Sequence, residues 1–360
     1  MKILVGLSGG VDSAVAAYLL KSQGHEVVGA TMSIWDKSSP LKAAHRDACF
    51  SPAEQDDIDE AKRICDKLGI AHHVVDCTAA YKKIVLDYFK SEYLSGRTPN
   101  PCVWCNGLIK FKALPEAAAA QGVEFDKFAT GHYARVEKDE TTGRYVLKRA
   151  KDPKKDQTYF IYRLRQEQLA RVVFPLGDYT KTQIREIAAG IGLTVADKPD
   201  SQDFYAGHYS DLLGVTEKTG YFKDVDGNVL GKHKGFWNYT VGQRKGLGVA
   251  AKEPLYVLRL DAENNDVILA SQKDVLEREV YAKDCNFIAV ESITEPVRLT
   301  AKVRSTQTPA PATVSPDGEN RVKVAFDEWQ KPAAAGQSVV FYDGDTVVGG
   351  GVLEKTRPAK

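Results

Sequence analysis

The sequence lacks an excess of charge of either sign, a long apolar run and a dense set of cysteines. Its 49 Lys and Arg residues nearly balance 48 Asp and Glu residues, so any nucleic-acid surface would have to be a local patch. No apolar stretch is long enough to cross a membrane, and the first is only a strand long, so we expect a cytoplasmic protein without a signal peptide or membrane partner. The six cysteines are too few for a disulfide scaffold. They are therefore expected to be either buried apolar residues or reactive residues of a functional site.

The order of the sequence patterns indicates more than one domain. A chain of 360 residues with 43% apolar residues can bury two or three cores. Up to about residue 135, strand and helix patterns alternate as in a parallel sheet covered on both faces. Beyond residue 279, short alternating runs separated by Asp-Gly turns predict a small all-β domain, in which residues 306–316 are expected to form a loop.

A glycine-rich loop follows the first predicted strand. Ser8-Gly9-Gly10-Val11-Asp12-Ser13 lies between the apolar run 3–7 and the helical pattern 14–21. A strand that turns through two glycines into a helix leaves backbone N–H groups facing a space where an anion can bind. No Gly-Lys-Ser/Thr follows and the three-glycine dinucleotide spacing is absent, so the loop is similar instead to the pyrophosphatase-type loop of adenylating enzymes. An ordinary strand–turn–helix is the alternative.

A pair of cysteines follows a proline-rich segment. Cys102 and Cys105 form a Cys-x-x-Cys motif after Thr98-Pro99-Asn100-Pro101. This spacing can form a strained disulfide, lower one thiol's pKa or chelate a metal. A structural zinc site would need a second pair of ligands, which the sequence lacks, so a redox-active or sulfur-carrying pair is favoured. Iron–sulfur ligation with Cys49 as third thiol stays open but is not favoured.

Basic residues gather in one stretch of the middle of the chain. Residues 141–185 hold eleven Lys or Arg against four Asp or Glu, with Tyr159, Phe160 and Tyr162 among them. Positive charges interleaved with aromatic rings are typical of a surface that binds a phosphodiester backbone and stacked bases. A solvated basic face is the alternative interpretation.

Seven ordered motifs together resemble the tRNA-specific 2-thiouridylases, the MnmA/TrmU family. Their order and spacing match from end to end of the chain. They are Ser-Gly-Gly-Val-Asp-Ser at 8–13, Thr-Pro-Asn-Pro at 98–101 before Cys105-Asn106, Ala-Thr-Gly-His-Tyr-Ala at 129–134, Lys-Asp-Gln at 155–157, Lys-Pro-Asp-Ser-Gln-Asp at 198–203, Tyr-Thr-Val-Gly-Gln-Arg-Lys-Gly-Leu-Gly at 239–248 and Ala-Gly-Gln-Ser-Val-Val-Phe-Tyr-Asp-Gly at 335–344.

The resemblance implies a fold and a reaction. The fold would be an α/β pyrophosphatase-loop domain at 1–205, a small central domain at 206–278 and a β-barrel-like domain at 279–360. The reaction would use ATP, with Mg²⁺, to adenylate the wobble uridine of a tRNA, and a cysteine persulfide supplied by a donor protein to replace the oxygen at carbon 2.

The resemblance also implies the site residues. Catalysis would use Cys105, Cys102 and Asp12. ATP would be bound by Gly6, Leu7, Ser8, Gly9, Gly10, Val11, Asp12, Ser13, Met32 and Gly131. The target base and the rest of the tRNA would be contacted by Asn100, Pro101, Cys102, His132, Lys155, Asp156, Gln157, Arg304, Ser305 and Gln337.

Two positions depart from the family pattern in the thiol chemistry. Most members carry an acidic residue where this chain has Cys102, and a second catalytic cysteine where it has Tyr205. A tyrosine can neither carry a persulfide nor close a disulfide. The loss of a cysteine at position 205 and the gain of one at position 102 suggest that Cys102 and Cys105 together carry the persulfide and close a disulfide during turnover. An iron–sulfur-dependent enzyme and a tRNA-binding paralogue without thiolation are the alternatives.

A third departure lies near the C-terminus. The chain reads Arg304-Ser305-Thr306-Gln307 where the family usually has an Arg-Tyr-Arg-Gln-like run, which affects the expected RNA contacts of the last domain.

Overall fold

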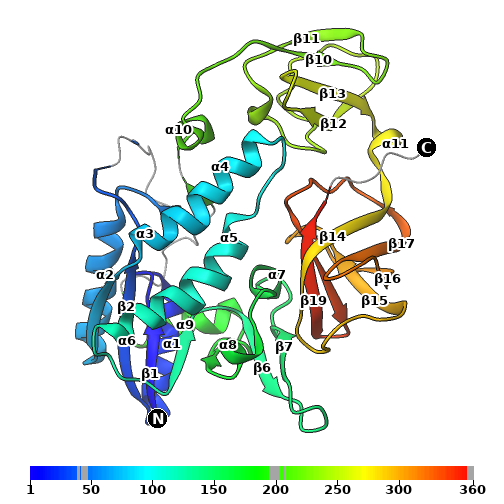
Figure 1. Cartoon of the computed structure of the whole chain (residues 1–360). Coiled ribbons are helices and arrows are strands. Elements are labelled where there is room, and N and C mark those ends of the chain that lie inside the picture. Colours follow the sequence, from blue (N-terminus) through cyan, green and yellow to red (C-terminus); the bar gives the residue numbers. More distant parts are fainter. Residues whose placement is uncertain (39–40, 42–47, 194–202, 206, 355–360) are drawn as a thin grey trace. The chain divides into compact units, whose positions relative to one another are not determined.

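The computed structural model describes residues 1–38, 41, 48–193, 203–205 and 207–354 (Figure 1). The chain divides into two compact units. The first comprises residues 1–85, 101–207 and 345–347, and the second comprises residues 86–100, 208–344 and 348–360. The segment before the thiol pair therefore belongs with the second unit, although the residues on both sides of it belong with the first.

The first unit is built on a five-stranded parallel sheet with strand order β4-β2-β1-β5-β8. The central strand β1 is fully buried at Ile3, Leu4 and Val5, as expected where helices cover both faces. The order reverses between β1 and β5, and open α/β sheets bind ligands beyond the carboxyl ends of their strands at such a point. The strands are β1 (Lys2–Gly6), β2 (Glu26–Ser33), β4 (Ala71–Asp76), β5 (Lys127–Thr130) and β8 (Val172–Val173).

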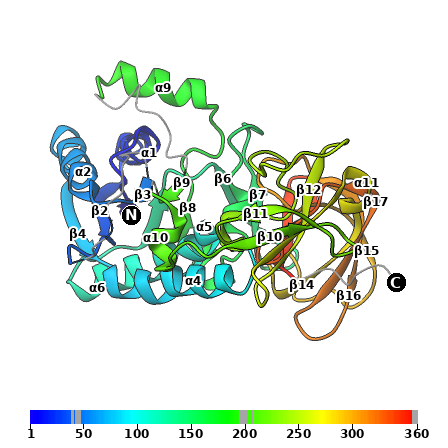
Figure 2. The same ribbon diagram turned by 90° about the horizontal axis from the view of Figure 1, so that it is seen from above.

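Helices lie on both faces of this sheet. Figure 2 shows α1 and α9 on one face and α6 on the other. Val11, Ala14 and Val15 of α1 share a buried apolar cluster with Ile184 and Ala188 of α9. The helices are α1 (Val11–Ser22), α2 (Glu54–Leu68), α3 (Thr78–Tyr81), α6 (Leu114–Ala120), α7 (Thr158–Ile161), α8 (Gln166–Leu169) and α9 (Lys181–Gly190).

Two pairs of short strands complete the first unit. The hairpin of β6 (Ala134–Lys138) and β7 (Tyr145–Arg149) pairs with Thr346 and Val347. A separate parallel pair joins β3 (Ala48–Phe50) to β9 (Asp203–Tyr205). Residues 198–202, which carry most of the Lys-Pro-Asp-Ser-Gln-Asp motif, lie outside the described residues.

The thiol pair lies on a continuous helical stretch of the first unit. It runs through α5 (Pro101–Trp104), the π-helical segment η2 (Cys105–Ala113) and α6. Proline suits the first position of a helix, because its missing N–H would have no partner there, so Pro101 fixes where this stretch begins. A second helical stretch, α3 with the π-helical segment η1 (Lys82–Leu86) and α4 (Asp87–Leu94), passes from the first unit into the second.

The second unit contains a small four-stranded sheet with order β11-β10-β13-β12. Phe89 and Tyr93 of α4 contact the ring of Tyr209, with centroids 5.1 and 5.6 Å away. The elements are α10 (Tyr209–Leu213), β10 (Gly220–Lys223), β11 (Val229–His233), the 3₁₀ segment η3 (Phe236–Asn238), β12 (Leu255–Asp261), β13 (Asp266–Ser271) and α11 (Gln272–Val275).

A closed β-barrel forms the rest of the second unit. Its strands follow the order β14-β17-β16-β15-β18-β19, and β14 also pairs with β19. Their inward residues make one apolar core, which includes Val314, Val324 and Phe341. The strands are β14 (Glu277–Phe287), β15 (Val297–Lys302), β16 (Ala310–Pro316), β17 (Val322–Gln330), β18 (Ser338–Asp343) and β19 (Thr346–Leu353).

The barrel corrects one sequence prediction. The loop expected over residues 306–316 is wrong from residue 310 onward, because Ala310–Pro316 is strand β16 between β15 and β17. Its buried Ala312 and Val314 alternate with more exposed neighbours, and the prolines at both ends obscured this pattern.

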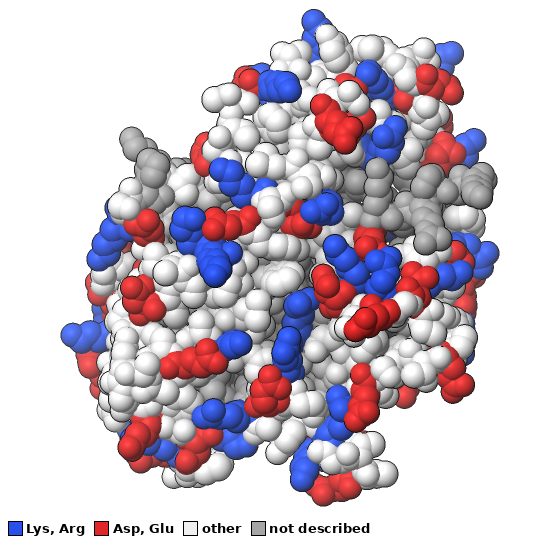
Figure 3. Space-filling view, in the orientation of Figure 1, with Lys and Arg blue, Asp and Glu red and all other residues white. Residues whose placement is uncertain are grey.

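The distribution of charged side chains on the surface agrees with the near balance of basic and acidic residues in the sequence. Figure 3 shows Lys and Arg interspersed with Asp and Glu over the visible face, with no broad area of one sign. Among the described residues, no helix is both long and apolar enough to span a bilayer.

Candidate active site

The glycine loop joins β1 to α1 as the sequence predicted. Gly9 has φ of +67°, and a Cβ there would lie 2.7 Å from the carbonyl oxygen of Asp57, so only glycine fits. Ser13 Oγ donates to the Gly10 carbonyl at 3.1 Å and accepts from the Ser8 N–H at 3.2 Å. These two bonds fix the loop at the N-terminus of a twelve-residue helix, where backbone N–H groups and the helix dipole favour an anion.

Asp12 is held by two side chains from outside the loop. Lys181 Nζ lies 2.8 Å from both carboxylate oxygens, and the Tyr133 hydroxyl donates to Oδ1 at 2.8 Å. The side chains of Lys181 and Asp12 are 11% and 27% exposed, so this ion pair is partly shielded from water. The loop therefore carries a fixed cation beside its single carboxylate.

Sequence analysis placed Lys181 only within a basic stretch. A local signal was available, because Thr180 and Gln183 form a capping box that starts α9 at Lys181. A lysine in the first turn of a helix opposes the helix dipole, so a nearby anion stabilises it. Asp12 is that anion, but its distance of 169 residues in sequence hides the pairing.

Gly131 and His132 follow β5 beside the loop. A Cβ on Gly131 would lie 2.6 Å from the Ser13 nitrogen, so the strand end packs directly on the loop. His132 Nδ1 lies 2.8 Å from Thr130 Oγ1, and its ring contacts Phe111 and Phe174. Burial, helped by the charge of Lys110, lowers the pKa of His132 to about 3, so this imidazole is neutral. Its contact with tRNA stays a prediction.

Cys102 and Cys105 differ in their exposure. Cys102 is half-buried, whereas Cys105 is 8% exposed. Burial raises the pKa of the Cys105 thiol to about 12, and the charge of Lys110 opposes this rise. Burial acts to lower the pKa of Lys110, but the charges of Cys105, Cys49 and Cys102 raise it above its usual value. At neutral pH the Cys105 thiol is therefore neutral and Lys110 is a cation.

Two contacts fix the position of this helical stretch within the first unit. Asn106 Nδ2 donates to the Phe160 carbonyl at 3.1 Å, and the guanidinium of Arg163 stacks on the Trp104 ring at 4.3 Å. All six cysteines are free thiols, and among the described residues no three His, Cys, Asp or Glu side chains are placed to hold a metal ion.

Profiles of three domain families match the chain in succession. They are the tRNA methyl transferase HUP domain over residues 1–205, the tRNA methyl transferase PRC-barrel domain over residues 213–271 and the aminomethyltransferase beta-barrel domain over residues 277–353. A protein from Endomicrobium trichonymphae named tRNA-specific 2-thiouridylase MnmA is 51% identical over 356 residues, covering 98% of this chain and 99% of that protein. The chain belongs to the tRNA-specific 2-thiouridylase family.

A second relative agrees with this assignment. A protein of the same name from Clostridioides difficile is 45% identical over 362 residues, covering 99% of this chain and 98% of that protein. A crystal structure of a 4-thiouridine synthetase–RNA complex with bound ATP is 16% identical, with a TM-score of 0.34 over 59% of this chain and 45% of that chain, which is too low to support an argument. The family resemblance drawn from the seven motifs and the three-part fold are thus confirmed.

The Lys-Asp-Gln motif contains two residues with structural roles. The Asp156 side chain is 1% exposed, and its Oδ1 and Oδ2 accept from the Thr158 hydroxyl at 2.9 and 3.0 Å. Gln157 Oε1 accepts from the Tyr133 N–H at 2.8 Å. Lys155 is half-buried and Lys154 is exposed, so the lysines are the members of this segment that can meet an RNA backbone.

The barrel residues of the predicted site lie in the second unit. Gln337 Nε2 donates to the carbonyls of Thr98 and Pro99 at 3.0 and 3.1 Å, so it holds the segment that precedes the thiol pair. Arg304 donates to the Pro332 carbonyl at 2.6 Å, and the Ser305 carbonyl accepts from Lys302 at 3.4 Å. Sequence analysis could not assign the partners of Gln337, because they lie 239 and 238 residues away in sequence.

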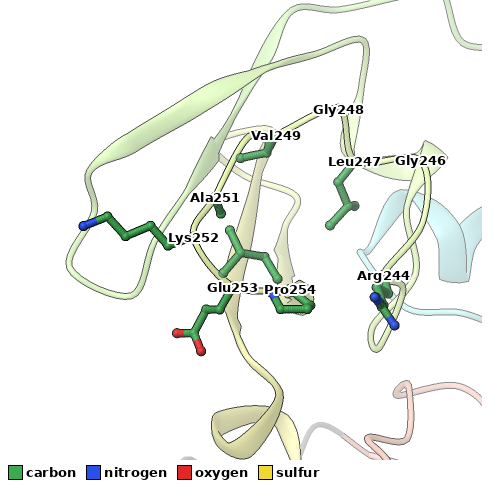
Figure 4. Close-up of a pocket in the computed structure, with 10 residues that line it drawn as sticks. Arg244, Gly246, Leu247, Gly248, Val249, Ala251, Lys252, Glu253 and Pro254 are labelled. Carbon is green, nitrogen blue, oxygen red and sulfur yellow. The ribbon is translucent and has the colours of Figure 1, made fainter.

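A pocket in the second unit lies within the loop that carries the Gly-Gln-Arg-Lys-Gly motif (Figure 4). Its volume is about 400 Å³, and its lining extends from Arg244 to Leu255. Its charged side chains are Arg244, Lys252 and Glu253. None of the predicted nucleotide or thiol residues lines it, so it gives no support for a role in the reaction.

Proposed function

We propose that this protein uses ATP to replace oxygen by sulfur at carbon 2 of the wobble uridine in tRNA. The observation that carries the proposal is that the first unit contains both a glycine loop at the N-terminus of a helix and a helical segment with two thiols. Identities of 45–51% over nearly the full length with proteins named tRNA-specific 2-thiouridylase support it.

The first step activates the uracil oxygen, which is a poor leaving group. The oxygen attacks the α-phosphate of ATP, and pyrophosphate leaves. The loop 8–13 and the N-terminus of α1 stabilise the departing negative charge, and Lys181 adds a cation beside them. Met32 lies near the carboxyl end of β2 and Gly131 follows β5, so both are proposed to line the nucleotide site with Gly6 and Leu7.

Magnesium is proposed to accompany ATP. Mg²⁺ usually keeps several waters and takes one or two carboxylates together with the substrate phosphates. Asp12 is the carboxylate at the loop, so it fits this use, with Lys181 sharing the same oxygens. When bound, the ion would neutralise phosphate charge.

The second step transfers sulfur from Cys105. The terminal sulfur of a Cys105 persulfide attacks carbon 2, and AMP leaves with the former carbonyl oxygen. The Cys102 thiolate then attacks the Cys105 sulfur, which breaks the bond to the transferred sulfur and frees 2-thiouridine. A Cys102–Cys105 disulfide results, and a dithiol reductant restores both thiols.

The proposed tRNA contacts fall into two groups. Lys155, Arg304 and Ser305 are proposed to meet the RNA, and Asn100 and Pro101 to face the target base. The second group consists of His132, Asp156, Gln157 and Gln337. Their side chains already form hydrogen bonds within the protein, so they are proposed to act at least in part by holding neighbouring segments in place for the tRNA. A persulfide-donating protein is the further partner, and the cytoplasm is the proposed location.

Mass spectrometry of tRNA nucleosides tests this function. Purified protein is incubated with tRNA, ATP and a persulfide donor, and 2-thiouridine should accumulate together with AMP and pyrophosphate. Cys105→Ser should abolish the product, and Cys102→Ser should limit it to a single turnover. Pyrophosphate without 2-thiouridine, or tRNA binding without ATP turnover, would contradict the proposal.

A further inference from the structure

The thiol proposed to carry sulfur begins a π-helical segment. This segment, η2, runs over the nine residues Cys105–Ala113, between α5 and α6. The backbone hydrogen bonds of a π-helix join residues five apart, so Lys110 lies about one turn from Cys105. In an α-helix, which has about 3.6 residues per turn, the residue five places on would lie on another face. The wider helix therefore brings a lysine to the face that carries the thiol.

A side chain from a neighbouring helix supports this wide turn. Gln168 of α8 donates through Nε2 to the carbonyls of Gly107 and Phe111, at 2.9 and 3.1 Å. These two carbonyls lie on either side of Lys110 in the sequence. π-Helical turns are rare and are frequent at functional sites. The placement of Lys110 relative to Cys105 is thus held by tertiary contacts as well as by the backbone of η2.

Lys110 is a half-buried cation without a carboxylate partner. Its side chain is half-buried, whereas Lys112 on the same segment is exposed. A charge that is removed from water is normally paired, because its desolvation costs free energy. Among the described residues Lys110 forms no ion pair with an Asp or Glu, and the groups whose charges raise its pKa are thiols, with Cys105 the strongest. This cation is therefore placed for an anion that forms during the reaction.

Lys110 is also the source of positive charge at Cys105. The other groups whose charges act on the Cys105 thiol cannot be positive, because they are the thiols of Cys49, Cys102 and Cys77. Arg163 follows α7, which packs against η2, but its guanidinium stacks on the Trp104 ring and is not among the groups that act on Cys105.

The remaining titratable side chains packed around η2 are phenols and an imidazole. Helices α3 and α7 pack against η2 and carry the buried phenols of Tyr81 and Tyr159. The imidazole of His132 lies 5.4 Å from the ring of Phe111. Burial raises the pKa of Tyr81 well above its ordinary value and lowers the pKa of His132 to about 3, so both are neutral near pH 7. Neither can replace the charge of Lys110.

We propose that Lys110 is the cation that stabilises the sulfur anion at Cys105 while sulfur is received and transferred. The Cys105 thiolate attacks the outer sulfur of the donor's persulfide, and the released donor thiolate takes up the proton that the Cys105 thiol gave up. The Cys105 persulfide, again as an anion, then attacks carbon 2, and AMP leaves. Lys110 keeps its proton throughout and acts through its charge. This inference rests on the proposed function and leaves Cys102 as the resolving thiol.

Alkylation of Cys105 by iodoacetamide tests this charge effect without ATP or tRNA. The thiolate is the nucleophile, so the rate constant at a fixed pH follows the fraction of anion, and peptide mass spectrometry reports Cys105 separately from the other thiols. Lys110→Met should lower the rate constant about tenfold, because a nearby opposite charge usually shifts a pKa by one unit or more. Lys110→Gln should do the same, and Lys110→Arg should stay close to the parent. Lys112→Met, which removes an exposed lysine of the same segment, is the matched control and should equal the parent.

The direction of the change separates charge from packing. A substitution that only loosened the helical stretch would expose the Cys105 thiol and speed its alkylation. Faster alkylation in Lys110→Met, or an unchanged rate, would overturn the inference. A loss in Lys110→Arg as large as that in Lys110→Met would also overturn it, because arginine keeps the charge.

Single-turnover sulfur transfer supplies a second readout. With Cys105 loaded as a persulfide and tRNA saturating, Lys110→Met should form 2-thiouridine about tenfold more slowly at neutral pH and regain rate as the pH rises. Its affinity for tRNA should equal that of the parent. Weaker tRNA binding with an unchanged transfer rate would place Lys110 on the RNA surface and overturn the inference. If the parent forms no 2-thiouridine, the proposed function fails instead, and the alkylation rates still decide the charge effect.

Discussion

Replacing Lys181 by methionine tests whether the ion pair at the glycine loop serves activation. Methionine keeps an unbranched apolar stem but removes the cation that contacts both oxygens of Asp12. The Asp12 carboxylate would keep its hydrogen bond from the Tyr133 hydroxyl but would lose its ion pair with Lys181.

The size of the effect follows from the burial of the pair. Hydrogen bonds to charged groups contribute roughly 1.5–3 kcal/mol when they are shielded from water. Lys181 is 11% and Asp12 is 27% exposed on their side chains, so solvent weakens the pair only in part. A loss of about 2 kcal/mol corresponds to roughly 30-fold in a rate if the cation acts on the developing pyrophosphate charge as strongly as on Asp12.

Single-turnover release of pyrophosphate in the presence of tRNA measures this effect. We expect Lys181→Met to release pyrophosphate roughly 30-fold more slowly while binding tRNA as the parent does. Lys223→Met is the matched control, because Lys223 pairs with Asp266 at 2.5 Å in the small sheet of the second unit. It should lower the free energy of unfolding without changing the rate of pyrophosphate release.

The combination with Asp12→Asn decides whether the two residues act together. If they do, the double variant should be no slower than the slower single variant. Release at the parent rate in Lys181→Met, or strictly additive losses in the double variant, would refute the coupling of this ion pair to activation.

Three further predictions concern the RNA surface, the buried imidazole and the barrel contact. Replacing Lys154 and Lys155 by alanine should weaken tRNA binding and reduce the slope of log affinity against log salt by up to about 2, and an unchanged slope in titrations would show that neither lysine meets a phosphate. Because the pKa of folded His132 is about 3 against 6.5 when exposed, the unfolded state binds the proton first as pH falls, so stability is lost between these values. Urea unfolding at several pH values should show a flatter acid limb for His132→Phe, and an identical limb would contradict the assignment. Gln337→Ala removes two bonds to the carbonyls of Thr98 and Pro99, and hydrogen exchange of the Thr98 amide should become up to roughly 30-fold faster, since each such bond contributes about 1 kcal/mol. Unchanged protection would show that other contacts hold this segment.

The parts of the site that local sequence defines were predictable. The glycine loop and the Cys-x-x-Cys segment each combine a turn or helix start with its chemistry within a few residues, so both were found. The parallel sheet followed from the alternation of strand and helix patterns, and the barrel from short runs separated by Asp-Gly turns. These features depend on contacts between near neighbours, which sequence patterns report directly.

The parts that depend on long-range pairing were not predictable. The bond from Gln337 to Thr98 spans 239 residues, and nothing near Gln337 indicates that its partner is a carbonyl rather than an RNA. The strand Ala310–Pro316 was assigned to a loop because its prolines weigh against a strand, although its register between two neighbours supplies the pairing.

The membership of residues 86–100 in the second unit has a consequence for the order in which the enzyme is made. The Thr98 amide bonds to the Ala335 carbonyl, and Gln337 completes the anchor. A ribosome that adds roughly 5–20 residues per second reaches Gln337 roughly 10–50 s after Thr98. Until then the nascent chain carries Cys102 and Cys105 behind a segment that lacks its barrel anchor. The segment before the thiol pair is therefore fixed among the last events of synthesis, and a chain released early would contain both cysteines behind a segment without its barrel anchor.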